Sequence, residues 1–104
     1  MATVCLSALP SGDTMRRNRL LNLTRSLASK DNVSLVLYGD GVYNLINGSQ
    51  AAAEMAEAPV TIYAIAEDIE LRGLAGKIVS QAQQVDYGKV VDLVMEADHT
   101  ITGL

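Results

Sequence analysis

The sequence predicts a three-layer α/β sandwich, in which a mostly parallel, five-stranded sheet is covered by helices on both faces. The first observation is segment 60–66, an almost unbroken apolar run that suits a strand covered on both sides. The second is the change to Glu67 and Asp68, whose carboxylates stand where the first turn of a helix leaves N–H groups unpaired. The third is the recurrence of strand-then-helix patterns along the chain. Parallel neighbouring strands need crossover connections, which are right-handed, and helices between the strands supply them.

The first half of the chain is expected to hold two strands and their helical connections. A helix capped by Asp13 or Thr14 should run to about Ser29, because leucines recur along it at the spacing of one helical face. Glycines 39 and 41 break the second apolar run. In order, the expected elements are a strand at 2–7, a helix at 14–29, a strand at 33–38, a short helix at 42–46, and a short helical piece or ordered loop at 49–58.

The second half repeats the pattern. Pro59 can begin a strand, because the first residue of a strand does not have to donate an N–H to the sheet. Gly73 is expected to end the following helix. Asp86 is expected to cap the last helix. That helix has an apolar stripe expected to face the core, formed by Val90, Val91, Val94 and Met95. The expected elements are a strand at 60–66, a helix at 67–73, a strand at 83–85, a helix at 87–97 and an edge strand at 100–102.

Length and composition indicate one globular domain, residues 1–104. The net charge of −4 disfavours a free-standing nucleic-acid-binding protein, which normally carries a basic face. The one basic cluster is interpreted as a solvated helix face; it consists of Arg16, Arg17, Arg19 and Arg25. No apolar run approaches the roughly 20 residues that span a membrane, and the N-terminus has no signal-peptide pattern. The expected location is the cytoplasm, with no contact to a membrane.

A single cysteine excludes an intramolecular disulfide framework and a multi-cysteine metal site. Cys5 lies within an apolar strand, where a free cysteine usually behaves as a small buried hydrophobe. A reactive thiol needs a lowered pKa and some exposure. Cys5 is the one candidate nucleophile or sulfur carrier, but nothing in the sequence pairs it with His99, the single imidazole. No catalytic residue is therefore assigned.

The carboxyl ends of the predicted strands carry an acidic rim, and ligands of open α/β sheets gather at this edge. The rim residues are Asp40, Gly41, Glu67, Asp68, Asp86 and Tyr87. Two interpretations remain open: the carboxylates cap helices, or they form a site for a small ligand or a cation. The chain has no glycine-rich phosphate loop, and no spacing demands a metal, so no cofactor is predicted.

Three stretches carry the motifs of one protein family, in matching order and spacing. They are Tyr-Gly-Asp-Gly-Val-Tyr at 38–43, the strand and helix at 60–74 with Glu67-Asp68 and Arg72-Gly73, and 85–93 with Asp86-Tyr87. In these stretches, and over nearly its whole length, the chain resembles the DsrH/TusB family of sulfur-relay proteins. The resemblance implies a DsrE-like fold with a flavodoxin-like strand order.

The resemblance also implies a role as one subunit of a heterohexamer with DsrE/TusD-like and DsrF/TusC-like proteins. Such complexes pass persulfide sulfur towards tRNA 2-thiouridine synthesis or act in sulfur oxidation, and the carrier cysteine belongs principally to the DsrE/TusD-like subunit. Some DsrH members have a cysteine on the first helix, but the helix expected at 14–29 has none. The family's terminal Trp is also missing. The missing cysteine favours a non-catalytic, non-carrying partner of a sulfurtransferase complex, and the missing Trp implies that the C-terminal contacts differ from those of the family.

Three alternatives stay open: a homodimer, a stand-alone module that binds a small ligand or metal at the acidic rim, and a sulfur carrier acting through Cys5. Tyr38 and Tyr43 could equally be interface residues or core aromatics. The candidate interface or rim residues are Tyr38, Asp40, Gly41, Tyr43, Glu67, Asp68, Arg72, Asp86 and Tyr87.

Overall fold

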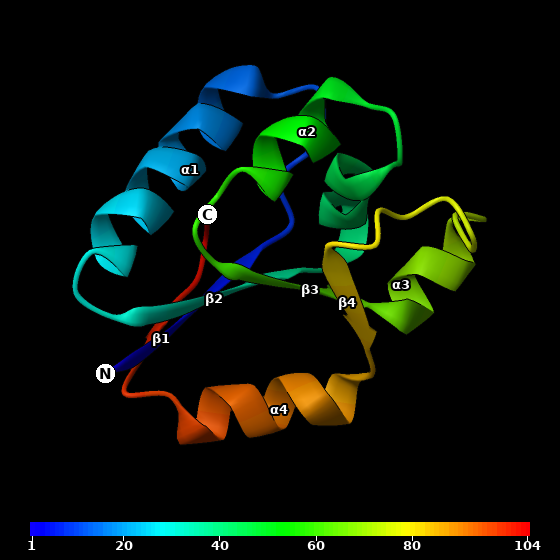
Figure 1. Ribbon diagram of the computed structural model, residues 1–104. Helices are drawn as coiled ribbons and strands as arrows, with labels where there is room; N and C mark the ends of the chain where they lie inside the picture. Colours follow the sequence, from blue (N-terminus) through cyan, green and yellow to red (C-terminus); the bar gives the residue numbers. More distant parts are fainter.

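Five parallel strands form a single sheet at the centre of the computed structural model, which describes all 104 residues (Figure 1). The strands are β1 (Ala2–Ser7), β2 (Asn32–Leu37), β3 (Thr61–Ile65), β4 (Ala82–Val85) and β5 (His99–Ile101). The helical elements are α1 (Thr14–Ala28), the 3-10 helix η1 (Gly39–Leu45), α2 (Gln50–Ala56), α3 (Ala66–Leu71) and α4 (Tyr87–Glu96). The predicted elements are thus all present, with boundaries that shift by a few residues.

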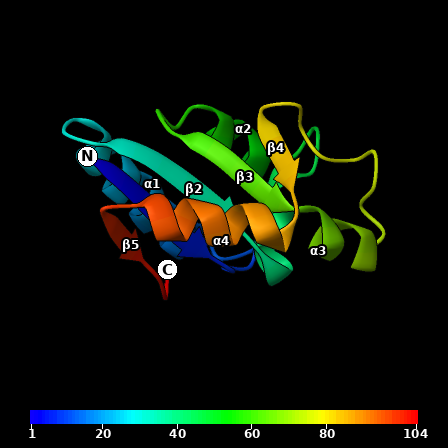
Figure 2. The ribbon, with the colours of Figure 1, turned by 90° about the horizontal axis from the view of Figure 1, so that it is seen from below.

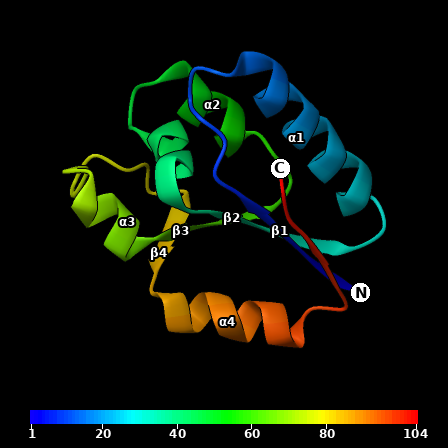
Figure 3. The ribbon, with the colours of Figure 1, turned by 180° about the vertical axis from the view of Figure 1, so that it is seen from behind.

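The strand order is β4-β3-β2-β1-β5. The prediction of a five-stranded parallel sheet with helices on both faces is confirmed, but the flavodoxin-like order is wrong. That order, 2-1-3-4-5, places the first strand between the second and the third. Here β2 pairs with both β1 and β3, so the chain steps in one direction from β1 to β4. It then crosses the sheet once and adds β5 outside β1, as Figure 3 shows from behind.

The two faces of the sheet are covered unequally, because right-handed crossovers place helices on one face while the chain advances and on the other when it returns. Figure 1 shows α1, α2 and η1 above the sheet, where the main core of 16 buried residues lies. Below the sheet, α4 alone crosses the strands (Figure 2). The buried cluster on that side has three members, Val4, Val36 and Ile65.

The predicted inward stripe of α4 is wrong for two of its four residues. Val90 and Val94 pack against the small cluster beneath the sheet, as expected. Val91 and Met95 instead remain 59% and 79% exposed. A single helix lying on a sheet buries one stripe of side chains, and α4 uses Val90, Leu93, Val94 and Ala97 for it. None of the helices has the length and apolar character needed to cross a bilayer.

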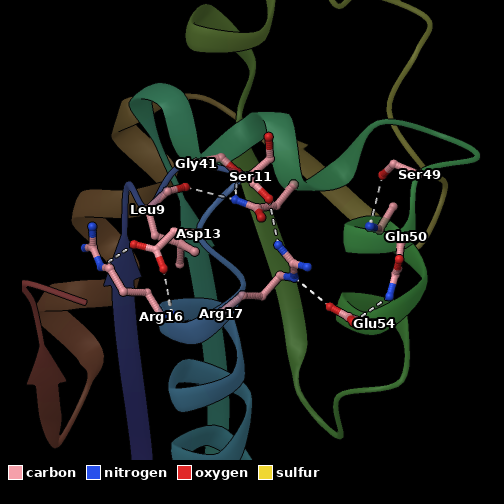
Figure 4. A network of polar contacts seen from close by, with 11 residues as sticks. Leu9, Ser11, Asp13, Arg16, Arg17, Gly41, Ser49, Gln50 and Glu54 are labelled. Carbon is pink, nitrogen blue, oxygen red and sulfur yellow. Dashed lines mark hydrogen bonds and ion pairs between the residues drawn. The ribbon is translucent and has the colours of Figure 1, made fainter.

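The interpretation of the arginine cluster as a solvated face is wrong for Arg17, which is 4% exposed. Its Nε–H donates to Glu54 on α2 at 2.6 Å, and its Nη1 donates to the carbonyl oxygen of Ser11 at 2.7 Å (Figure 4). The guanidinium thus ties α1 to α2 and to the loop before α1. The same region contains Asn44, which donates to the carbonyl oxygens of Leu9 and Gly41.

The Arg17–Glu54 pair predicts a pH dependence of stability. The hydrogen bond from Arg17 lowers the pKa of the Glu54 carboxyl. Because the pKa of Glu54 is lower in the folded state than the unfolded value of about 4.3, the ion pair stabilises the fold fully at pH values above the unfolded pKa. This stabilisation is lost as the pH falls through the folded-state pKa. We expect Glu54→Gln to lower the free energy of unfolding at neutral pH and to flatten its decline below about pH 4.3. Urea unfolding at a series of pH values measures both effects.

The matched control is Glu57→Gln, which changes an exposed carboxylate at the end of the same helix. This variant should keep the wild-type pH profile. An unaltered acid decline in Glu54→Gln would show that the ion pair does not contribute to it.

Candidate interaction site at the carboxyl ends of the strands

The three family-like stretches meet at one edge of the sheet. The carboxyl ends of parallel strands lie at the same edge, and β2, β3 and β4 are neighbours. η1 begins after β2, α3 directly after β3, and α4 directly after β4. The first turns of these three elements therefore come together, although they are far apart in the sequence.

The carboxylate of Asp68 lies at the centre of this meeting point and is largely buried, with 7% of the residue exposed. It accepts a hydrogen bond from the backbone N–H of Gly39 at 3.0 Å and another from the hydroxyl of Tyr87 at 3.1 Å. The Nη1 of Arg72 lies 3.7 Å from it as an ion pair. One side chain on α3 thus links η1, α3 and α4.

Arg72 extends the network to the surface. Its Nε and Nη2 both lie 3.0 Å from one carboxylate oxygen of Asp40, whose side chain is 67% exposed. Its Nη1 also donates to the carbonyl oxygen of Asp68 at 3.2 Å. The guanidinium therefore joins a buried carboxylate to an exposed one, and it holds η1 against the end of α3.

Each of the two glycines in the 38–43 stretch is required for a different structural reason. Gly39 has a φ of 54°, in the left-handed region that glycine adopts without strain. Gly41 has an ordinary backbone, but a Cβ there would lie 2.8 Å from the carbonyl oxygen of Ser7 and 3.1 Å from the Cα of Ala8. η1 therefore packs directly on the backbone at the end of β1, and no larger residue fits at position 41.

Tyr87 is half exposed and shapes the electrostatics of the site. The hydrogen bond to Asp68, with desolvation and the charges of Asp68 and Glu67, raises the pKa of its phenol above the ordinary value. The hydroxyl therefore stays protonated and remains a donor at neutral pH. Glu67 has one buried carboxylate oxygen, Oε1, with no hydrogen-bond partner.

The remaining candidate residues lie beside the network or serve other roles. Asp86 caps α4, since its carboxylate accepts from the N–H of Lys89 at 2.8 Å. Tyr43 packs against the main core, whereas Tyr38 is 38% exposed. The interpretation of Asp40, Glu67 and Asp86 as helix caps is confirmed for Asp86 alone, because neither η1 nor α3 has a side-chain cap and Asp40 pairs with Arg72.

The candidate nucleophile and the cavities of the structure lie apart from the Asp68 network. Cys5 is fully buried in β1, and burial raises the pKa of its thiol. No group of three or more His, Cys, Asp or Glu side chains is placed to hold a metal ion. The cavities of the structure lie elsewhere: against α1 at Arg16 and Leu23, beside Asn32, and beside α2. The edge is built instead as a surface with a rigid polar centre.

The network predicts that Asp68 matters far more for stability than Asp40, although both pair with Arg72. Asp68→Ala is expected to lower the free energy of unfolding by about 2 kcal/mol or more, because the Gly39 N–H and the Tyr87 hydroxyl lose their shared acceptor. Asp40→Ala removes an exposed partner and should cost less than about 1 kcal/mol. Chemical denaturation of the two variants and the wild type gives the comparison, and equal losses would contradict the central role of Asp68.

Comparisons with known proteins show which family the chain belongs to and which structures share its fold. The sequence profile of the family described as "DsrH like protein" matches residues 14–100. Proteins named Protein TusB from Salmonella arizonae and Salmonella newport are each 39% identical to the chain over 67 residues, which cover 64% of this chain and 70% of theirs.

Two solved structures share the fold at low sequence identity. The ychN protein from E. coli superposes with a TM-score of 0.72 at 13% identity, covering 97% of this chain and 96% of that one. BT1422, a conserved protein of unknown function from Bacteroides thetaiotaomicron, superposes with a TM-score of 0.78 at 17% identity, covering 97% of this chain and 93% of that one. Because the family profile matches most of its length, the chain belongs to the DsrH-like family.

Proposed function

We propose that this protein is a non-carrying subunit of a sulfur-relay complex that delivers persulfide sulfur for tRNA 2-thiouridine synthesis. The observation that carries the proposal is a contrast between two places in the chain. The residues that meet at Asp68 all lie within the stretch matched by the DsrH-like family, 14–100. The one cysteine, Cys5, lies outside that stretch and is fully buried.

Sulfur transfer explains why this contrast matters. In each step an acceptor thiolate attacks the terminal sulfur of a persulfide, the old S–S bond breaks, and the donor leaves as a thiolate. The acceptor therefore has to be exposed and ionised. Cys5 meets neither condition, because it is enclosed by the main core and burial raises its pKa. The sulfur would be carried by a cysteine of another subunit.

The partners we propose are DsrE/TusD-like and DsrF/TusC-like proteins in a mixed hexamer. The chain would act as one domain in the cytoplasm, where thiols are kept reduced. Its contribution would be a structural surface, and the edge around Asp40, Tyr38 and Tyr87 supplies exposed charged and aromatic groups of the kind found at interfaces.

Co-expression with DsrE- and DsrF-like subunits tests the proposal. We expect the chain to co-purify with both, and the mass of the complex in solution to correspond to a mixed hexamer. A monomer or homodimer that binds neither subunit at micromolar concentration would contradict the proposal.

The accessibility of Cys5 gives a separate prediction. In the native protein Cys5 should resist iodoacetamide at neutral pH and react rapidly after unfolding, because the folded thiol is buried and un-ionised. Ser80→Cys supplies the positive control, since position 80 is exposed and its thiol should label in the folded state. Mass spectrometry follows both reactions. Rapid labelling of native Cys5, or loss of sulfur transfer by the mixed complex in Cys5→Ala, would assign the carrier role to this chain.

A further inference from the structure

Helix α4 presents a stripe of exposed apolar side chains to solvent. Tyr87, Val91 and Met95 are spaced four residues apart and so lie on one side of the helix. They are 50%, 59% and 79% exposed. The side chains that cover the sheet belong to other positions of the helix, including Val90 and Val94. The stripe is therefore not needed to cover the sheet.

Helix α3 carries a further exposed apolar side chain, that of Leu71. The Tyr87 hydroxyl contacts Asp68, and the charge of Glu67 also acts on the phenol. Leu71 lies one helical turn after Glu67 and is 81% exposed. Figures 1 and 2 show the start of α3 near the start of α4, at the carboxyl ends of β3 and β4, and α3 then extends outward to Leu71, its last residue. We call the set Leu71, Tyr87, Val91 and Met95 the α3–α4 surface.

Acidic side chains border the α3–α4 surface. Asp92 and Glu96 directly follow Val91 and Met95 and are exposed, and Glu70 is exposed beside Leu71. Two cations lie here as well: Lys89 on α4 is exposed, and Arg72, next to Leu71, is paired with Asp40 and Asp68. The exposed acidic residues at the border outnumber Lys89, and five other basic residues belong to α1 or the turn after it, above the sheet: Arg16, Arg17, Arg19, Arg25 and Lys30. The apolar stripe thus sits in a local field of negative charge.

We infer that the α3–α4 surface binds a different protein through an apolar ridge flanked by lysines or arginines. The acidic border favours such a partner and disfavours a second copy of this chain. A two-fold dimer uses the same patch on both subunits, so the acidic border of one copy would face the acidic border of the other. Like charges so placed cost several kcal/mol and suppress the wrong partner. The inference rests on the proposed function only in its expectation that this partner is a relay subunit.

A peptide titration tests the chemistry without any relay protein. The probe is a helical peptide with leucines along one face and lysines on both flanks, and its control replaces each lysine with glutamate. The lysine peptide should shift the amide NMR signals of α3 and α4 and bind more weakly as salt is raised. The double variant Val91→Glu/Met95→Glu should weaken binding at least about tenfold, which corresponds to 1.4 kcal/mol. Met15→Glu is the matched control, because Met15 is a methionine on α1 with 69% exposure.

Equal binding of the lysine and glutamate peptides would overturn the inference. So would self-association of the wild-type chain that Val91→Glu/Met95→Glu abolishes, since a second copy would then be the occupant.

The mixed complex identifies the partner. Loss of the complex in Val91→Glu/Met95→Glu, with retention in Met15→Glu, would support a relay subunit as the occupant. Retention in both variants would overturn the assignment of a relay subunit as the occupant and leave the proposed function standing. If the wild-type chain forms no mixed complex, the proposed function fails alone, and the peptide titration still decides the chemistry of the surface.

Discussion

The edge at the carboxyl ends of the strands depends on the hydrogen bonds and the ion pair of one buried carboxylate, that of Asp68. A buried charge is costly unless it is paired and hydrogen-bonded, and Asp68 obtains its partners from Gly39, Arg72 and Tyr87. These groups belong to separate segments that follow β2, β3 and β4. Each segment must therefore adopt one position relative to the others, so the edge has a defined shape before any partner arrives.

The strand order explains why the rest of the molecule is asymmetric. Because the chain advances strand by strand from β1 to β4, its early helices collect on one face and build a large core there. The single return through α4 covers the other face, where the buried cluster is small. A lone helix cannot bury a wide apolar surface, so part of α4 stays exposed. The fold itself thus generates an apolar flank beside the Asp68 network.

Much of the fold was predictable from the sequence because the strands and helices depend on local patterns of apolar and polar residues. Apolar runs marked the strands, and Asp13 and Asp86 marked two helix starts. The strand order was not predictable, since it depends on contacts between segments that are distant in the sequence. The rim residues were identified as a set from the sequence, but the pairing of Asp40 and Asp68 with Arg72 was not, because it too depends on contacts between distant segments. The pattern of α4 could not tell whether its own sheet or another surface covers Val91, and the burial of Arg17 depends on Glu54 from another helix.

Stability and recognition are carried by neighbouring but different side chains in this protein. Asp68 and Gly41 are enclosed, so changing them disturbs the fold as well as the edge. Leu71, Val91 and Met95 are mostly exposed and add little to folding, so a charge placed there leaves the core intact. Effects of those exposed positions on assembly can therefore be attributed to contact with a partner. On the proposed function, a subunit whose one thiol is buried in its core would contribute to the relay through such a surface, rather than through a thiol of its own.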